Sequence, residues 1–180
     1  PDNSFGTNGT VVVEVRLDLA RANSARDFLI QPDGKILAAG GSINFGHDSS
    51  ALTRLNPDGT LDQSFGAGGK VINDAAPLRP DRINTVMLLP DGKILAGAIA
   101  NDALFSRFAL ARFNEDGTLG DDFAEGGKFL NQTCPSCGDE LTTDMTVQQD
   151  GKILLFGITY SAINERDNYQ LIRLHPDGRI

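Results

Sequence analysis

Two cysteines separated by two residues are the most distinctive chemical feature of the sequence. Cys134 and Cys137 have the spacing of a redox-active pair or of half a structural zinc site. The chain contains no other cysteine, and its two histidines, His47 and His175, lie far from the pair in the sequence. The spacing favours a local disulfide that closes a surface loop, which suits an oxidising compartment. Free thiols and an intersubunit metal are the alternatives.

Two aspartates could bind a cation. Asp27 and Asp144 fall at equivalent positions when similar segments of the chain are aligned, and Thr85 occupies a third such position. Two carboxylates and a hydroxyl could hold a metal if neutral oxygens completed its coordination shell. The alternative, which we favour, is a set of hydrated polar side chains at the mouth of a water-filled channel. We therefore expect no cofactor.

Nucleophilic catalysis has one weak candidate. A hydrolase needs a base beside a nucleophile, and His47 is followed by Asp48 and by two serines. These residues belong to one short loop, which cannot orient a catalytic triad by itself. We therefore predict that the protein is not an enzyme.

The recurrent Asp-Gly pairs predict turns rather than calcium sites. With the turn glycine at the sixth position of an EF-hand-type loop, the first ligand would be Arg54, a cation where a carboxylate is required. The same mismatch occurs at Arg112 and Arg173. We expect these arginines to bond to backbone carbonyls or to acids such as Asp62 and Asp121 on the adjacent strand.

A repeated unit must position these residues, because three motifs recur in the same order along the chain. The first motif, Pro-Asp-Gly-Lys-Ile-Leu, begins at Pro32 and Pro90 and recurs from Gln149 with glutamine in place of proline. Its aspartates are 58 and 59 residues apart. The second motif, Arg-Leu-Asn-Pro-Asp-Gly at 54–59, and the third, Ser-Phe-Gly-Ala-Gly-Gly-Lys at 64–70, also have counterparts. The chain therefore contains three copies of one unit.

Each copy is predicted to form antiparallel strands joined by tight turns. In Pro-Asp-Gly, the proline sets φ for a type I turn, and the glycine adopts the left-handed conformation that begins the returning strand. Gln149 therefore predicts a looser third turn. The first three strands of the successive copies are predicted at residues 28–31, 36–39 and 51–55, at 86–89, 94–97 and 110–113, and at 145–148, 153–156 and 170–174.

A fourth strand is expected after the second turn of each unit. Val11–Leu19 shows the clearest period of two, with Glu14, Arg16 and Asp18 on one face, as in an edge strand half open to water. Leu19–Arg26, just beyond it, could instead form a helical turn. The unit is thus a four-stranded antiparallel sheet.

Such units predict an all-β protein of the β-propeller type, with three four-stranded antiparallel blades per chain. Inner strands that are apolar on both faces fit the face-to-face stacking of blades. The order Leu-Asp-x-Ser-Phe-Gly, Gly-Gly-Lys, Pro-Asp-Gly-Lys-Ile-Leu, Arg-Leu-Asn-Pro-Asp-Gly-Thr also resembles the delta-60 repeat, a tandem module of bacterial, largely exported proteins. The resemblance implies a propeller-like fold and a secreted or surface location, but no catalytic residue.

The repeat boundaries leave an incomplete blade at each end of the chain. Residues 1–20 align with the outer strand of a blade that another segment or chain would complete. Repeats 1, 2 and 3 cover residues 21–80, 81–140 and 141–180, and repeat 3 lacks its last strand. Because propellers close with roughly four to eight blades, we expect one of two arrangements. Copies self-associate by strand complementation, as a six-bladed ring of two chains or an open polymer, or neighbouring repeats of a longer chain complete the blades.

Composition and charge limit the classes of partner. The sequence is 40% hydrophobic and 22% charged, which is typical of a globular chain. Sixteen Lys and Arg against 24 Asp and Glu give a net charge of -8, which argues against nucleic-acid binding. No apolar run reaches the roughly 18 residues that a spanning helix needs, so we expect no membrane span.

Selective binding is expected where the repeats differ most. The connection after the second strand varies between copies, and the meander places it opposite the invariant turns. The binding-face candidates are its bulky and cationic side chains: Phe45, His47, Phe105, Tyr160, Arg166 and Tyr169. The sequence thus predicts a non-catalytic exported repeat module for assembly, adhesion or protein binding at the cell surface or in an extracellular structure, with a surface protein or glycan as candidate ligand. The alternative is a hydrolase-type or lyase-type propeller enzyme with a metal at Asp27 and Asp144.

Overall fold

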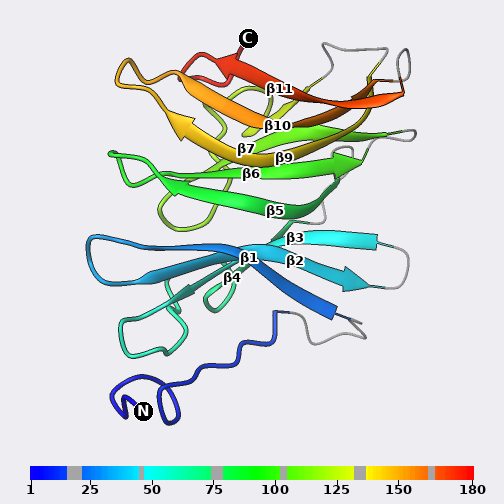
Figure 1. The fold of residues 1–180 in the computed structure, drawn as a ribbon. Coiled ribbons are helices and arrows are strands. Elements are labelled where there is room, and N and C mark those ends of the chain that lie inside the picture. Colours follow the sequence, from blue (N-terminus) through cyan, green and yellow to red (C-terminus); the bar gives the residue numbers. More distant parts are fainter. Residues whose placement is uncertain (16–21, 45–46, 74–78, 102–104, 132–136, 162–164) are drawn as a thin grey trace.

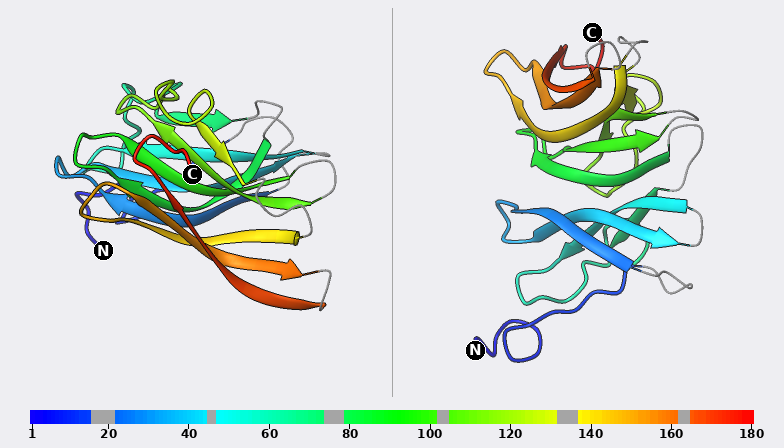
Figure 2. Two further views of the ribbon diagram at one scale, coloured as in Figure 1. Left: turned by 90° about the horizontal axis from the view of Figure 1, so that it is seen from above. Right: turned by 45° about the vertical axis from the view of Figure 1, so that its right-hand side comes forward.

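The chain folds into a stack of three antiparallel β-sheets, called blades 1, 2 and 3 in chain order (Figure 1). This computed structural model describes residues 1–15, 22–44, 47–73, 79–101, 105–131, 137–161 and 165–180. Blade 2 lies between the other two, and the chain termini lie at opposite ends of the stack (Figure 2). The described residues form no helix, and so none that is long and apolar enough to span a membrane.

Each blade is a meander whose strands pair in chain order. Blade 1 contains β1 (Ala22–Ile30), β2 (Ile36–Asn44), β3 (His47–Leu55) and β4 (Lys70–Asn73). Blade 2 contains β5 (Arg79–Leu88), β6 (Ile94–Asn101), β7 (Ser106–Phe113) and β8 (Lys128–Leu130). Blade 3 has three strands in the described part of the chain: β9 (Cys137–Val147), β10 (Ile153–Ser161) and β11 (Arg166–Leu174). The all-β antiparallel architecture predicted from the repeats is confirmed.

The first turn of each blade is the hairpin that its motif predicts. In blade 1 the Gln31 N–H donates to the Lys35 carbonyl over 2.8 Å, and the Gly34 N–H donates to the Gln31 carbonyl over 2.9 Å. Gly34 has a φ of +82°, a conformation that glycine adopts without steric cost. The blade 3 turn has the same two bonds at 2.8 and 2.9 Å, although Gln149 replaces the proline. The looser third turn expected from the sequence is therefore wrong, because the hydrogen bonds and the glycine define the turn without proline.

The hydrophobic core lies between the sheets. One cluster joins blades 1 and 2 through residues such as Leu37, Leu52 and Ile94, and a second joins blades 2 and 3 through residues such as Leu95 and Leu155. Neighbouring side chains of a strand point to opposite faces, so Ile94 and Leu95 of β6 belong to different clusters. β6 and β7 are consequently buried along almost their whole length, which explains their continuous apolar runs.

The beginning of β1 corrects one expectation. β1 starts at Ala22, so residues 22–26 are strand and not part of the helical turn considered for Leu19–Arg26. Pairing with β2 is continuous from Ala22 opposite Ile43 to Ala25 opposite Gly40, where a bulge follows. Backbone hydrogen bonding across this long hairpin outweighs the local preference for a helical turn.

The N-terminal segment, residues 1–15, lies across the outer face of blade 1. The structure assigns no strand to residues 11–15, the described part of the strand expected over Val11–Leu19. A strand needs a partner for its N–H and C=O groups, and no strand pairs with residues 11–15 among the described residues. The predicted alternation is nevertheless present, since Val13 is half-buried and Val12 and Glu14 are exposed.

A glycine-rich loop of each repeat docks on the second turn of the following blade. In each case one backbone N–H group of the loop donates to a backbone carbonyl of the turn over 2.7–2.9 Å. The three bonds run from Gly6 to Asp58, from Gly66 to Asp116 and from Ala124 to Asp177. The N-terminal loop therefore makes on blade 1 the contact that each internal loop makes on the next blade. In structural terms, the N-terminal loop is the equivalent of the loops at 64–70 and 122–128.

The second-turn glycine is required for two reasons. Gly117 has a φ of +88°, which disfavours any side chain. A Cβ there would also lie 2.7 Å from Val71 Cγ2 and 3.0 Å from Phe65 Cε2, and Phe65 is fully buried. The docking of one repeat on the next thus depends on the absence of a side chain in the turn.

We predict that Gly117→Ala destabilises the fold more than Gly126→Ala. Gly126 also has a positive φ, +56°, but a Cβ there would meet nothing within 4 Å. The left-handed conformation alone should cost about 1–2 kcal/mol at either site, and displacement of Phe65 should add about 1–3 kcal/mol at Gly117. Urea denaturation measures both variants. Equal losses would contradict a tightly docked loop.

Candidate assembly interface

The two aspartates considered as metal ligands lie on different blades and accept backbone hydrogen bonds. The Asp27 carboxylate accepts from the N–H groups of Phe28 and, in blade 2, Val86, both over 2.8 Å. The Asp144 carboxylate accepts from the Met145 N–H over 2.8 Å. A cation at Asp27 would compete with two N–H donors that need an acceptor. Within the described ranges, no group of three or more His, Cys, Asp or Glu residues could hold a metal ion.

The variable loops are only partly described. Phe45 and Cys134 lie outside the described residues, and the structure gives only the backbone of His47 and Cys137. The disulfide and the loop-binding hypotheses therefore stay predictions. Phe105 is placed, and the Arg107 guanidinium lies 5.0 Å from the centre of its ring.

The other binding-face candidates lie on blade 3. Tyr160 on β10 and Tyr169 on β11 point to the outer side of the blade, away from blade 2. Arg166 is exposed where β11 begins, opposite Ser161 in the β10–β11 register. The structure therefore brings the two tyrosines to one sheet face, and Phe105 is not part of that face.

The outer face of blade 3 is an exposed apolar surface. Leu171 lies directly opposite Phe156 in the register, and the rings of Phe156 and Tyr169 are 5.8 Å apart between centres. Leu171 is 62% exposed and Tyr169 is 83% exposed. The face is completed by Leu141 and Tyr160, both partly exposed. Covering a large apolar side chain is worth about 1.5–3 kcal/mol, so this face favours a partner.

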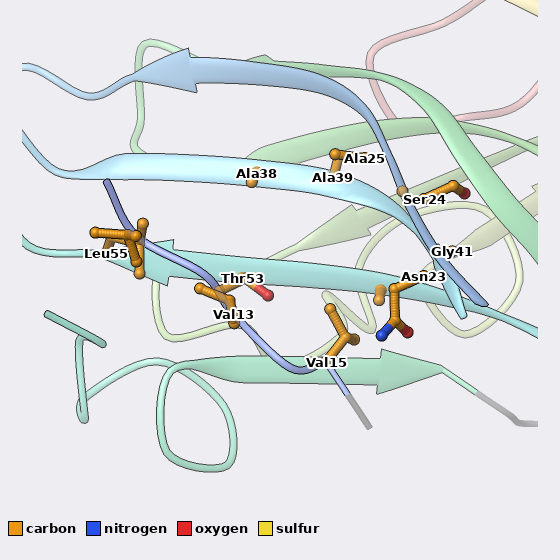
Figure 3. Close-up of a pocket in the computed structure, with 13 residues that line it drawn as sticks. Val13, Val15, Asn23, Ser24, Ala25, Ala38, Ala39, Gly41, Thr53 and Leu55 are labelled. Atoms are coloured by element: carbon orange, nitrogen blue, oxygen red, sulfur yellow. The ribbon is translucent and has the colours of Figure 1, made fainter. Parts of the chain in front are cut away.

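Blade 1 has a second apolar face at the opposite end of the stack. Phe28 and Ile30 on β1 are 68% and 66% exposed and point away from blade 2. Beside them, the N-terminal segment runs across the blade and leaves a cavity of about 350 Å³ (Figure 3). The cavity walls come from two sets of small or apolar residues: Val11, Val13 and Val15 on the segment, and Ala38, Ala51, Thr53 and Leu55 on the sheet.

These two outer faces correspond to the two sides of the buried contact between blades 1 and 2. Aligned by their turns, Phe28 and Ile30 of blade 1 occupy the positions of Val86 and Leu88, which face blade 1 from blade 2. Leu171 of blade 3 occupies the position of Leu52, which faces blade 2 from blade 1. The described stack thus carries one half of its own internal interface on each outer face.

An ion pair closes blade 1 and ties it to blade 2. The Arg54 Nε lies 2.7 Å from Asp62 Oδ2, and its Nη1 donates to the Glu115 carbonyl of blade 2 over 2.6 Å. The guanidinium also lies 4.5 Å from the centre of the Phe65 ring. These contacts confirm the expected bonds to an acid and to a backbone carbonyl.

Blade 2 repeats this arrangement with one difference from the sequence-based expectation. Arg112 pairs with Asp122, not with Asp121, and its guanidinium lies 4.8 Å from the centre of the Phe123 ring. The loop register explains the difference, because Asp122 directly precedes Phe123, whose ring lies beside the Arg112 guanidinium. The arginine, the acid and the phenylalanine therefore act as one structural unit in each complete blade.

The Asp62 carboxylate is kept ionised inside this network. Burial raises its pKa, but the hydrogen bonds from the Ser64 hydroxyl and N–H, and then those from Arg54 and Lys35, outweigh this effect. The resulting pKa lies well below the usual range of an aspartate. The negative charge is therefore part of the folded state at neutral pH.

A second polar seam joins blades 2 and 3. Glu140 is completely buried, and its two carboxylate oxygens accept from the Phe108 N–H over 3.0 Å and from Asn131 Nδ2 over 2.8 Å. Thr142 adds a bond from its hydroxyl to the Ala98 carbonyl over 2.8 Å. These residues could not be predicted from the sequence, because a single polar residue in an apolar strand does not indicate which neighbouring backbone group it meets.

The stacked meanders and their interlocking loops define a β-propeller-type repeat protein. The family model described as Domain of unknown function (DUF5122) beta-propeller matches residues 31–65, 89–120 and 148–180, one segment in each repeat. These segments make up more than half of the chain, which therefore belongs to this β-propeller family. No curated protein matches the chain. The β-propeller fold predicted from the repeats is thus confirmed.

We predict that Arg54→Met destabilises the fold by about 3–5 kcal/mol, because it removes the buried cation that pairs with the Asp62 carboxylate. Arg173→Met is the matched control, since Arg173 has the equivalent position but is exposed, and it should change stability by about 0.5 kcal/mol or less. Denaturant unfolding at low protein concentration compares the two. Similar effects would contradict the bridging role of Arg54.

The low pKa of Asp62 predicts a loss of stability in acid. A carboxyl with a lower pKa in the folded than in the unfolded chain stabilises the fold above its unfolded pKa of about 3.9, and this contribution fades as pH falls toward the folded pKa. We expect the free energy of unfolding to decrease below about pH 4 and to decrease less steeply in Asp62→Asn. Denaturant titrations between neutral and acidic pH measure both slopes, and identical slopes would refute the assignment.

Proposed function

We propose that the chain is a non-catalytic module that assembles with like repeats through its two outer faces. One observation carries the proposal. Leu171 is 62% exposed, whereas Leu52 and Leu110, at the equivalent positions of blades 1 and 2, are each 1% exposed. The same residue type at the same position is buried wherever a following blade is present.

The cost of leaving these faces uncovered supports assembly. Monomeric proteins rarely expose large contiguous apolar patches, and those that exist commonly mark interaction sites. Phe28 and Ile30 at one end, and Phe156, Tyr169 and Leu171 at the other, would each gain at most about 1.5–3 kcal/mol from burial, because each is already partly covered. Such gains can offset the entropy lost when two subunits associate.

The sequence supports an extracellular setting for this assembly. We infer from the motif order that the repeats are of the delta-60 type, whose proteins are largely exported. A disulfide between Cys134 and Cys137 would fit the same compartment. Adhesion or binding of a surface protein or glycan would then use the loop end that carries Arg166.

The native mass tests the proposal. We expect particles of more than one copy whose population increases with protein concentration, and we expect Leu171→Glu to shift them toward the monomer because it places a charge on the outer face of blade 3. Ala67→Glu is the matched control, since it adds the same charge at an exposed loop position where the next repeat already carries Glu125. Light scattering after size exclusion gives the masses.

Two results would contradict the proposal. The first is a monomer that persists at high protein concentration with its stability intact. The second is an assembly that Leu171→Glu and Ala67→Glu weaken equally, since the added charge and not the buried face would then be responsible.

A further inference from the structure

We infer that residues 1–15 of one copy of the chain supply the closing loop and the fourth strand of blade 3 in a second copy. This inference rests on the proposed assembly and specifies its contact. The partner is another copy because blade 3 and residues 1–15 are matching parts of one blade, as the complete blades 1 and 2 show.

The N-terminal loop already has the conformation of a docked loop. Asp2 Oδ1 accepts from the Ser4 N–H over 2.9 Å and from the Ser4 hydroxyl over 2.6 Å. Asp62 Oδ1 accepts the same two bonds from Ser64, over 3.0 and 2.7 Å. The acid that closes blade 1 therefore has a preformed equivalent at Asp2.

The arginine that should meet Asp2 lies at the other end of the chain. In blade 1 the partner of Asp62 is Arg54, on the last strand before the second turn. Arg173 holds this position in blade 3, is exposed, and pairs with no carboxylate in the part of the chain that the structure describes. Asp2 likewise meets no arginine there. A second copy supplies each with its partner.

The strand registers of the complete blades define how the two segments pair. Leu52 lies opposite Val71 between β3 and β4, and Leu110 lies opposite Phe129 between β7 and β8. The equivalent pair is Leu171 of one copy opposite Val11 of the other. Val11 is already in place, because its Cγ2 lies over Gly59 as Val71 Cγ2 lies over Gly117.

The cavity beside residues 11–15 lies on the face of blade 1 that would receive blade 3 of the second copy. It measures about 350 Å³. The side chains of blade 3 are large, since Phe156 stands where blade 1 has Ala39 and Tyr169 stands where blade 1 has Ser50. Large groups on one face thus meet a cavity on the other.

The contact uses different surfaces on the two copies, so it is head-to-tail. Each copy offers an N-terminal segment at one end and an acceptor blade at the other. Such an interface gives a closed ring if the rotation between copies closes and an open chain if it does not. Two copies that close on each other would contain six blades, which is within the usual range of roughly four to eight.

Charge reversal tests the predicted pair between Asp2 and Arg173. Asp2→Arg alone and Arg173→Glu alone each place like charges together at every contact, so each should weaken self-association by about tenfold or more. An equimolar mixture should regain the wild-type mass, because alternating copies then make only opposite-charge contacts. Asp121→Arg, an exposed carboxylate in the equivalent loop of repeat 2, is the control and should assemble normally. Thermal unfolding of each variant at low concentration verifies that the monomer is folded.

Deleting residues 1–15 provides an independent test. We expect the shortened chain to lose self-association, yet to bind a second chain that keeps residues 1–15 and carries Arg173→Glu, through its own intact blade 3. Assemblies that resist both charge reversals and the deletion would overturn the strand exchange and leave the proposed assembly through outer faces intact. The absence of any assembly by the wild-type chain would overturn both.

Discussion

The whole structure depends on covering both faces of an apolar sheet. β6 and β7 supply side chains to both core clusters, so blade 2 is stable only between two neighbours. Hydrophobic burial is not directional, and by itself it would allow blades to slide or rotate over one another. The interlocking loops and the buried polar bonds prevent this, because each bond forms at only one relative position of two blades.

The polar bonds also tie each repeat to two blades, so that the boundaries of a repeat in the sequence do not coincide with the boundaries of a blade. A glycine-rich loop such as 64–70 leaves one blade, docks on the second turn of the next, and returns to form the outer strand of its own blade. Arg54 links these steps, since it bonds to Asp62 in its own blade and to the Glu115 carbonyl in the next. Folding of one repeat therefore positions the turn that receives the loop of its predecessor, which makes neighbouring repeats mutually stabilising.

The sequence predicts the features that local chemistry determines. The turn glycines and the strand positions follow from the Pro-Asp-Gly motifs and the apolar runs. The full length of β1 did not follow, because its first residues are polar and small and become strand only through pairing with β2. The exposure of the outer faces could not be predicted from the sequence either. Phe156 and Leu171 have the alternation of core residues, and nothing in their own segment shows that no described blade covers them.

The proposed direction of assembly follows from the unequal character of the two ends. Two copies that met through the outer faces of blade 3 would not bring Asp2 to Arg173, and residues 11–15 would pair with neither sheet. Two copies that met through blade 1 would likewise keep Asp2 and Arg173 apart. Only the unlike pairing combines opposite charges, a strand with a sheet edge, and large side chains with a cavity. A stack with these two ends therefore favours head-to-tail growth over symmetric dimers.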